Sequence, residues 1–564
     1  MNRKPFLNNN RIKLLSKPIN GLGVLRKQFA SDILRLIPYT IKRLERKGKA
    51  KTSRIIGKYD EKTYRKLFDR YSVIPKTPSK NQKRLIRDIV RDLMGGVPLW
   101  RSPYFHYNVG AAVNRISSTL YGIALDLNIF NINDGLSGNT IIAEHAITRI
   151  LAKLAGVDQE KCYGIFTFGG TATNLYGIKL GVAKAFPRSA QNGLVGNIQV
   201  AVTEDSHFSH LNALNWIGVG AKNALIINGK DDRTSDIADA RVKLTEALKA
   251  GVTVPAIIIN GGTTYDNAID DIQAFVELRN ELVQDFNLAY VPHIHIDSVI
   301  GWVCLMFKDY DFDKNPLGIE ANTARLIKGQ YRKISKLSLA DSWGVDFHKG
   351  AGTCPIPCSM IIINDGATVA SLSWDEKVDT HQLSREFSEF SPVDYTLETS
   401  RPAGAPLAAL GAINALGAEG YQIHLANLIQ QNQLMRELFV HEKRDDVRVL
   451  NQQSPGYVTM IRIYPPNFAT ERKLELSSTE DGSAFVNNTN AYMKSFFTFD
   501  TKDRMLHGKG VEYSYSSKYV VAPNGAKLSA LKFYPTSPHI DSKHVYEAVA
   551  TFLKQKDKFD KANL

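Results

Sequence analysis

The segment DSWGVDFHKGAGT, residues 341–353, ends an apolar, strand-like run with His348 and Lys349, and small residues follow. A lysine at the end of a buried strand can form a Schiff base with an aldehyde, because its neutral amine is a nucleophile. This sequence is equally consistent with a lysine in a surface turn, since burying an ammonium is costly unless its charge is paired or lost. The choice depends on whether other segments supply an anion site, a carboxylate and a flat ring beside Lys349.

Groups of these kinds follow four earlier strand-like runs. A double glycine and Thr171 open a helix in FGGTATN (168–174), and the N-terminus of a helix favours an anion. His207 follows the next run, a glycine–hydroxyl turn occupies 260–270, and Asp297 ends HIHID. Each feature alone has an ordinary explanation as a tight turn, a histidine at a helix start or a helix cap.

Together these groups match the needs of one cofactor, pyridoxal phosphate. Its phosphate binds at a helix N-terminus, its ring nitrogen stays protonated beside an aspartate, its ring stacks on a flat side chain, and its aldehyde takes a lysine. The four positions that supply these groups are Thr171, His207, Asp297 and Lys349. Bound in this way, Lys349 would not be a buried free ammonium.

The elements that must position these residues alternate between strand and helix from about residue 80. Continuous apolar runs predict strands at 163–170, 198–205, 254–260, 292–297, 342–347 and 358–365. Helical spacing of apolar residues predicts helices at 140–157, 171–186 and 270–286. This alternation predicts an α/β fold with a mostly parallel sheet and helices on both faces, in which ligands bind beyond the carboxyl ends of the strands.

The pattern of predicted strands and helices changes after about residue 421. The runs YVTMIRIYP (457–465) and AKLSALKFYP (526–535) predict strands of a smaller α+β domain. We therefore expect three parts, which are a basic N-terminal arm over 1–80, a large cofactor-binding domain over 81–420 and a small C-terminal domain over 421–564.

The positive charge of the chain is concentrated in that arm. Residues 1–60 hold 16 of the 71 lysines and arginines but only three of the 56 acidic residues, which accounts for most of the net charge of +15. Contact of the arm with an anionic membrane or with nucleic acid is one interpretation. A solvated extension, or one packed on a partner subunit, is the favoured interpretation, and we expect no nucleic acid partner.

The composition is that of a globular protein with more than one domain. The chain has 564 residues, too many for one compact core, of which 43% are hydrophobic and 23% charged. No apolar run reaches the ~18 residues of a membrane helix, and the N-terminus lacks the apolar segment of a secretory signal. Four cysteines are too few for a disulfide framework and favour a reducing cytoplasm, while Cys354 and Cys358 lack the partners of a metal site.

The order of these motifs resembles that of the group II pyridoxal-phosphate-dependent amino acid decarboxylases, which include glutamate, aromatic-amino-acid and bacterial tyrosine decarboxylases. The resemblance runs from about residue 100 to 425. The segments that carry it are FTFGGTATNL, DSHFS, GGTTYDNAID, HIHIDSVIGW, DSWGVDFHKG and TLETSRPAGAPLAALGAINALGAEGY. Phe168 departs from the family pattern, because it replaces the usual small hydroxyl residue of the phosphate turn.

The resemblance implies a fold of the PLP-dependent transferase type (fold type I, similar to aspartate aminotransferase), a homodimer, and a role for each matched residue. Gly170 and Thr171 would bind the phosphate, His207 would stack on the ring, and Thr264 would lie near the cofactor oxygens. Asp297 would pair with the ring nitrogen. Lys349 would form the Schiff base, and His348 would assist proton traffic. Residues expected at the mouth of the site, where an amino acid would bind, are His106, Tyr107, Tyr395 and Arg401.

Two departures bear on the reaction. The long interval 306–336 resembles the bacterial tyrosine decarboxylase branch, which favours an aromatic or other large amino acid as substrate. Family members usually carry a tyrosine on a mobile loop, and between residues 366 and 400 this chain has only Tyr395. Members that lack that tyrosine can form aldehydes. The alternatives to an amine-forming decarboxylase are therefore an aldehyde-forming enzyme, a carbon–carbon lyase, and a catalytically silent relative that binds a partner through its basic arm.

Overall fold

The computed structural model describes residues 61–76, 82–375, 391–442, 444–466, 473–507 and 510–563. Most of the predicted basic arm, residues 1–60, lies outside the described residues. The chain divides into two compact units. One is Met1–Leu99 with Phe499–Gly510, in which α3 (Glu61–Tyr71) and α4 (Gln82–Leu93) are described. The other is Trp100–Thr498 with Val511–Leu564, and it holds both sheets.

The larger sheet has seven strands in the order β1-β7-β6-β5-β4-β2-β3. Strands β3, β2, β4, β5 and β6 run parallel, and β7 lies antiparallel between β6 and β1, so the predicted mostly parallel sheet is confirmed. The strand bounds are β1 Tyr163–Thr167, β2 Val200–Thr203, β3 Ala224–Ile227, β4 Ala256–Asn260, β5 His293–Asp297, β6 Ser342–Asp346 and β7 Ser359–Ile363.

Continuous apolar runs form this sheet because both of its faces are covered. Every residue of β1, β2, β4, β5, β6 and β7 is buried. Such strands show no alternation of polar and apolar side chains, which is typical of parallel sheets between helices. The sequence did not predict β3, whose residues are mostly part-exposed at the sheet edge.

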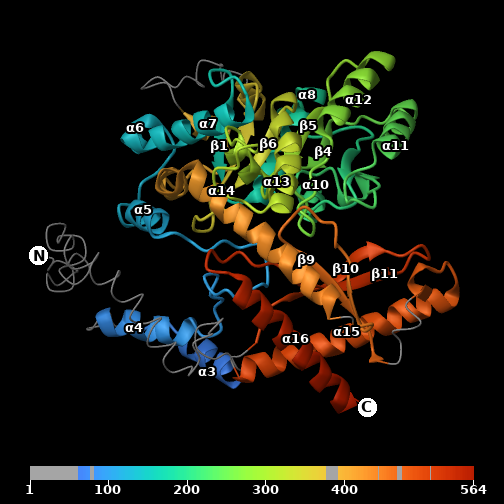
Figure 1. Ribbon diagram of the computed structural model, residues 1–564. Helices are drawn as coiled ribbons and strands as arrows, with labels where there is room; N and C mark the ends of the chain where they lie inside the picture. Colours follow the sequence, from blue (N-terminus) through green and yellow to red (C-terminus); the bar gives the residue numbers. More distant parts are fainter. Residues whose placement is uncertain are drawn as a thin grey trace, which may run out of the picture. The chain divides into compact units, whose positions relative to one another are not determined.

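Helices surround the strands of the large sheet, as Figure 1 shows around β1, β6, β5 and β4. The predicted helices at 140–157, 171–186 and 270–286 correspond to α7, α8 and α12. The helix bounds in this region are α5 Arg115–Asp126, α6 Asp134–Ser137, α7 Ile141–Ala155, α8 Gly170–Ala185, α9 Ser189–Asn192, α10 Ser209–Trp216, α11 Ile237–Lys249, α12 Ile272–Asp285 and α13 Ala321–Ile334. Short 3-10 helices lie at Gly138–Thr140, Ala221–Asn223, Gly301–Phe307, Ser335–Leu339, Gly366–Leu372 and Pro392–Asp394.

The long interval between Asp297 and Lys349 is partly an ordinary crossover. A connection between parallel neighbours such as β5 and β6 needs a dozen or more residues, usually with a helix. Here Gly301–Phe307 and α13 make that connection. Much of the segment 306–336 therefore belongs to the topology of the sheet.

The smaller sheet has four antiparallel strands in the order β10-β11-β9-β8, which confirms the predicted smaller α+β region. Its strands are β8 Val447–Val449, β9 Thr459–Ile463, β10 Ser514–Val521 and β11 Lys527–Phe533. Helices α15 (Glu480–His507) and α16 (Ser542–Asn563) accompany it. An aromatic cluster of Phe533, Phe552, Tyr513 and Phe439, with ring centroids 4.9–5.7 Å apart, joins β11 to α16 and α14.

One long helix connects the two sheets. Helix α14 (Gly404–His441), orange in Figure 1, bends at Gly417, whose φ is 59°. The predicted domain boundary at 420/421 falls within this helix just after the bend, and it stays a prediction. Within the described ranges, no helix combines the length and the apolar character that crossing a membrane requires.

Candidate active site

The carboxyl ends of two neighbouring strands bring the predicted lysine and aspartate to one edge of the sheet. Strand β5 ends at Asp297, and the adjacent parallel strand β6 ends at Asp346, three residues before Lys349. The start of α8 lies against the same edge, since a Cβ added to Gly170 would lie 2.7 Å from Oδ2 of Asp346. This edge is where ligands bind in open α/β sheets.

Lys349 is part-buried beside a carboxylate. Its Nζ lies 2.8 Å from Oδ2 of Asp346, which has no exposed surface, while about a fifth of the Lys349 side chain remains exposed (20%). Burial disfavours the ammonium, but the charges of Asp346 and Asp297 outweigh it, so the pKa of Lys349 lies above its ordinary value. The charge of this lysine is therefore paired.

The backbone around Lys349 is held by the segment that precedes α5. The N–H of Ala111 donates to the carbonyl of His348 (3.1 Å), and the N–H of Gly350 donates to the carbonyl of Val109 (2.7 Å). The ring of His348 is buried, with Nδ1 3.1 Å from the carbonyl oxygen of Cys358 and Nε2 3.9 Å from Asp346. His348 is thus close to the lysine's counterion.

Asp297 has one oxygen with two partners and one without. Nδ2 of Asn174 donates to Oδ2 at 2.9 Å, and Nε2 of His210 lies 2.9 Å from the same atom. The other oxygen, Oδ1, is buried and has no hydrogen-bond partner among the described residues. Burial opposes ionisation, but the contact with His210, the charge of Lys349 and the bond from Asn174 hold the pKa of Asp297 well below its usual range.

His207 lies in the turn after β2 as a neutral ring. Burial lowers its pKa to about 4, and its Nδ1 lies 2.8 Å from Oγ of Ser209. The charges of Asp297 and Lys349 also act on it, which places all three groups in one electrostatic site. A neutral imidazole offers a flat face for stacking on an aromatic ring.

The two predicted hydroxyl turns also open at this edge of the sheet. Gly169, with φ of 153°, immediately precedes α8, and the side chain of Thr171 in its first turn is exposed. Thr264 is half-buried in the turn after β4. Their hydroxyls therefore retain surface from which a ligand's oxygens can be contacted.

These residues fit pyridoxal phosphate. A buried carboxylate oxygen without a partner matches a protonated ring nitrogen, and a buried lysine with a neighbouring carboxylate matches the aldehyde. The helix start at Gly170 and the hydroxyl of Thr171 match the phosphate. The role of each residue remains a prediction.

The residues predicted at the mouth of the site are more dispersed. His106 is wholly buried, with Nε2 2.7 Å from the carbonyl oxygen of Pro103, and burial lowers its pKa to about 4. Tyr107 beside it is 44% exposed. Tyr395 is buried, and its hydroxyl contacts that of Tyr163. His381, Phe387 and Phe390, which share its segment, lie outside the described residues.

Arg401 is a buried partner of Glu144. Its Nη2 forms an ion pair with that carboxylate, and Nη1 donates to the carbonyl of Asn131 at 3.2 Å. The same carboxylate accepts the N–H of Phe166 in β1 at 2.8 Å. The guanidinium thus ties the start of α14 to the sheet. Its assignment to the substrate, like those of His106, Tyr107 and Tyr395, stays a prediction.

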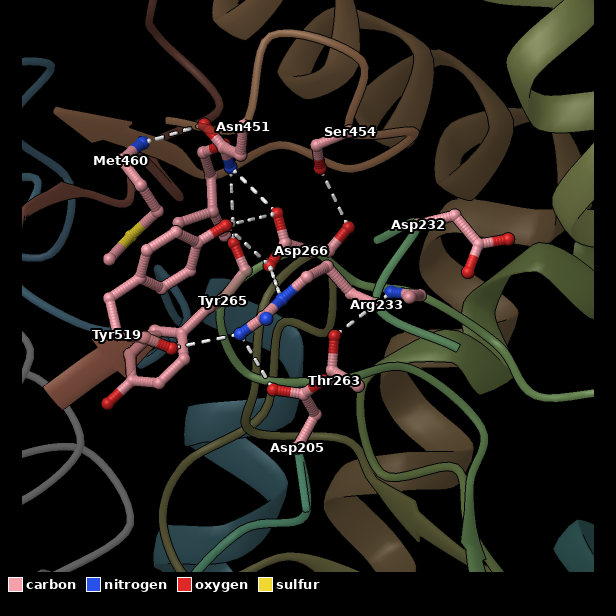
Figure 2. A network of polar contacts seen from close by, with 12 residues as sticks. Asp205, Asp232, Arg233, Thr263, Tyr265, Asp266, Asn451, Ser454, Met460 and Tyr519 are labelled. Atoms are coloured by element: carbon pink, nitrogen blue, oxygen red, sulfur yellow. Dashed lines mark hydrogen bonds and ion pairs between the residues drawn. The ribbon is translucent and has the colours of Figure 1, made fainter. Parts of the chain in front are cut away.

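A second polar network connects two of the turns at the sheet edge to the small sheet (Figure 2). Arg233 lies 2.7 Å from Asp205, two residues before His207, and 3.6 Å from Asp266, two residues after Thr264. The Arg233 guanidinium also donates to the carbonyl of Tyr519 in β10, whose hydroxyl donates to Asp266 at 3.0 Å. Both turns are therefore held by one cation.

This network borders a cavity of about 1320 Å³ that is separate from the lysine. Arg233, Asp266 and Tyr519 line the cavity, and Lys349 is not among its lining residues. Burial raises the pKa of Asp205 to about 6, against the opposing charge of Arg233. The network's position indicates a role in holding the turns and the small sheet together.

Sequence reasoning missed four residues of these networks. Asp346 lies in the motif that contains Lys349, and only its spacing of three residues from the lysine indicated that the two side chains could pair. His210 lies three residues after His207, in the first turn of α10, and nothing in its type or position predicted a contact with Asp297. The sequence around Asn174 and Arg233 did not predict their contacts, because their partners come from distant parts of the chain.

A mostly parallel sheet that brings a part-buried lysine and a buried aspartate to one edge fits the fold type I class of pyridoxal phosphate proteins. Residues 70–459 match the pyridoxal-dependent decarboxylase conserved domain. The chain therefore belongs to the pyridoxal-dependent decarboxylase family, and its cofactor is pyridoxal phosphate.

Relatives of known name agree with this family. The chain is 24% identical over 324 residues to an L-2,4-diaminobutyrate decarboxylase of Acinetobacter baumannii. This alignment covers 55% of this chain and 57% of the relative. The chain is 27% identical over 256 residues to a glutamate decarboxylase-like protein of Gibberella zeae, which covers 44% and 43%. These alignments span about half the length of the relatives. The crystal structure of mouse CSAD in apo form shares the fold, with a TM-score of 0.73, 14% identity and coverage of 93% and 98%.

Proposed function

We propose that the chain is a pyridoxal-phosphate-dependent decarboxylase that converts an L-amino acid to its amine and carbon dioxide. The observation that carries this proposal is the pairing of Lys349 with Asp346 at the end of β6, beside the partnerless oxygen of Asp297 at the end of β5. Membership of the decarboxylase family supports the choice of reaction.

Bound pyridoxal phosphate supplies an electron sink for the electron pair that remains on Cα when carbon dioxide leaves. Asp297 keeps the ring nitrogen protonated, because its low pKa leaves a full negative charge beside that nitrogen. His207 holds the plane of the ring by stacking, and it stays neutral because burial lowers its pKa. The start of α8 and the hydroxyl of Thr171 hold the phosphate.

Lys349 holds the aldehyde carbon and moves protons at its Nζ atom. Before it can act as a nucleophile, the ammonium must lose a proton, and the 2.8 Å contact between Nζ and Oδ2 of Asp346 holds the amine at the end of β6. His348, with Nε2 3.9 Å from the same carboxylate, would assist the removal of that proton. The residues that would orient the substrate carboxylate would select which bond to Cα breaks, and so would favour decarboxylation.

The substrate is an aromatic or other large amino acid. The segment 102–110 runs beside the lysine, because Val109 and Ala111 bond to the backbone on both sides of Lys349. Tyr107 in this segment is 44% exposed and offers a surface to such a side chain. The enzyme works as a homodimer in the cytoplasm, where its four buried cysteines stay reduced.

Borohydride reduction of the cofactor-loaded protein tests the role of Lys349. We expect the reduced cofactor on the peptide that contains Lys349, and none on that peptide in the Lys349→Ala variant. Lys314→Ala serves as a matched control, because Lys314 is 85% exposed and pairs only at the surface with Asp311. Attachment to a different lysine would overturn the assignment.

A further inference from the structure

His210 contacts the carboxylate predicted to pair with the ring nitrogen, yet its type and position gave no hint of this. It lies in the first turn of α10, is 1% exposed, and places Nε2 2.9 Å from Oδ2 of Asp297. Asn174 donates to the same oxygen at 2.9 Å. Two side chains from two helices therefore hold one oxygen of Asp297, and the other oxygen remains available to bind the cofactor.

The surroundings of His210 leave one ring nitrogen to contact Asp297. Its Nδ1 is buried and has no hydrogen-bond partner within the described part of the chain. Nε2 is the ring atom that faces the carboxylate, and with its proton there it donates to Oδ2 of Asp297.

Both partners of Oδ2 stabilise the ionised carboxylate of Asp297. Asn174 does so as an uncharged amide donor, and His210 does so through Nε2. The other titratable groups that act on Asp297 are Lys349, whose charge Asp346 shares, and the buried rings of His207 and His295. Burial lowers the pKa of these two rings to about 4 and about 3, so both are neutral.

We propose that His210 is a positioning residue that keeps Asp297 ionised and aims its free oxygen at the protonated ring nitrogen of the cofactor. This inference rests on the proposed function, because it assumes that pyridoxal phosphate binds at this edge of the sheet. His210 acts through Asp297 and does not contact the cofactor. Its loss weakens the hold on the ring nitrogen and makes that nitrogen easier to deprotonate.

Cofactor titration of two His210 variants tests the proposal. His210→Phe keeps a flat ring but removes the donor, and His210→Gln keeps an N–H donor of similar reach. We expect His210→Phe to raise the dissociation constant of pyridoxal phosphate about 10–100-fold, the value of a hydrogen bond to a charged group. We expect His210→Gln to restore most of the affinity. His424→Phe, at a buried histidine in α14, should leave the affinity unchanged.

The absorbance of the bound cofactor gives a second readout that a purely structural role would not move. Followed against pH, it reports the protonation of the ring, and the midpoint should fall in His210→Phe and return in His210→Gln. Unchanged affinity and midpoint in His210→Phe would overturn the inference while leaving the proposed function intact. If His210→Phe does not fold, loss of affinity in a folded His210→Gln variant likewise overturns it. A wild-type protein that binds no pyridoxal phosphate overturns both.

Discussion

Nζ of Lys349 lies 2.8 Å from Oδ2 of Asp346, so the predicted Schiff-base lysine has a wholly buried carboxylate as its counterion. The carboxylate stabilises the ammonium against burial, which raises the pKa of Lys349. In Asp346→Asn the lysine stays part-buried but loses that charge, so its pKa should fall and it should lose its proton at lower pH. The pH midpoint for uptake of pyridoxal phosphate by the apoprotein should fall, and an unchanged midpoint would count against the pairing.

Breaking the buried ion pair of Arg401 and Glu144 should destabilise the fold. The two charges are 4% and 1% exposed, and removing one partner leaves the other buried without compensation. We expect Arg401→Met to lower the free energy of unfolding by about 3–5 kcal/mol, measured by chemical denaturation. Arg149→Met is the matched control, because its pair with Glu160 is 49% and 73% exposed. A stable Arg401→Met variant with a raised KM would instead support the substrate assignment.

Buried histidines should make the protein sensitive to acid. Burial lowers the pKa of five rings to about 3 or 4, namely His106, His207, His293, His295 and His424. Unfolded histidines bind protons below their ordinary pKa of about 6.5, so the stability these rings provide is complete above that pH and lost as the pH falls toward 4. Burial raises the pKa of three carboxyls, those of Asp205, Asp266 and Asp270, and these act in the opposite direction but number three against five rings.

Thermal unfolding of the apoprotein from neutral pH down to about pH 5 measures this loss. We expect Tm to fall continuously over that range, and to fall less in His424→Gln, which removes one of the five rings. A Tm that stayed constant down to pH 5 would mean that the rings are not buried as described.

Lys532 in β11 should destabilise the fold at neutral pH. It is 7% exposed, its Nζ donates to Oδ1 of Asn108 at 3.2 Å and lies over the rings of Tyr265 and Tyr534, and burial lowers its pKa to about 8. Because the folded-state pKa lies below the unfolded value, stability should rise as the pH increases from about 8 to 10.5. At neutral pH we expect Lys532→Met to stabilise the fold by about 1–3 kcal/mol and to remove that rise. Destabilisation would indicate that the contacts of the ammonium with Asn108 and the two tyrosine rings outweigh the cost of burying it.

The strands that carry the site were predictable because their sequences are continuous apolar runs that end in a chemical group. Asp297 and Lys349 follow such runs, so their approach at one sheet edge followed from parallel pairing alone. The pattern gives no strand direction, which is why the antiparallel β7 was not foreseen. Strand β3 escaped prediction because Ala224–Ile227 is short and part-exposed.

The surroundings of the site were less predictable, because they depend on packing between distant elements. His210 reaches Asp297 only because α10 lies beside α8 and the end of β5. His106 and Tyr107 are neighbours in sequence, yet one is wholly buried and the other 44% exposed. Residue type alone could not separate them, since histidine and tyrosine occur in both settings.

Mass spectrometry of the products tests the central proposal most directly. Cofactor-loaded protein is incubated with pooled L-amino acids, and the products are compared between the wild type, Lys349→Ala and Lys314→Ala. We expect an amine that is lighter than one amino acid by one carbon dioxide, formed by the wild type and by Lys314→Ala but not by Lys349→Ala. An aldehyde in its place, or no product from protein that holds its cofactor, would contradict the assignment of this chain as an amine-forming decarboxylase.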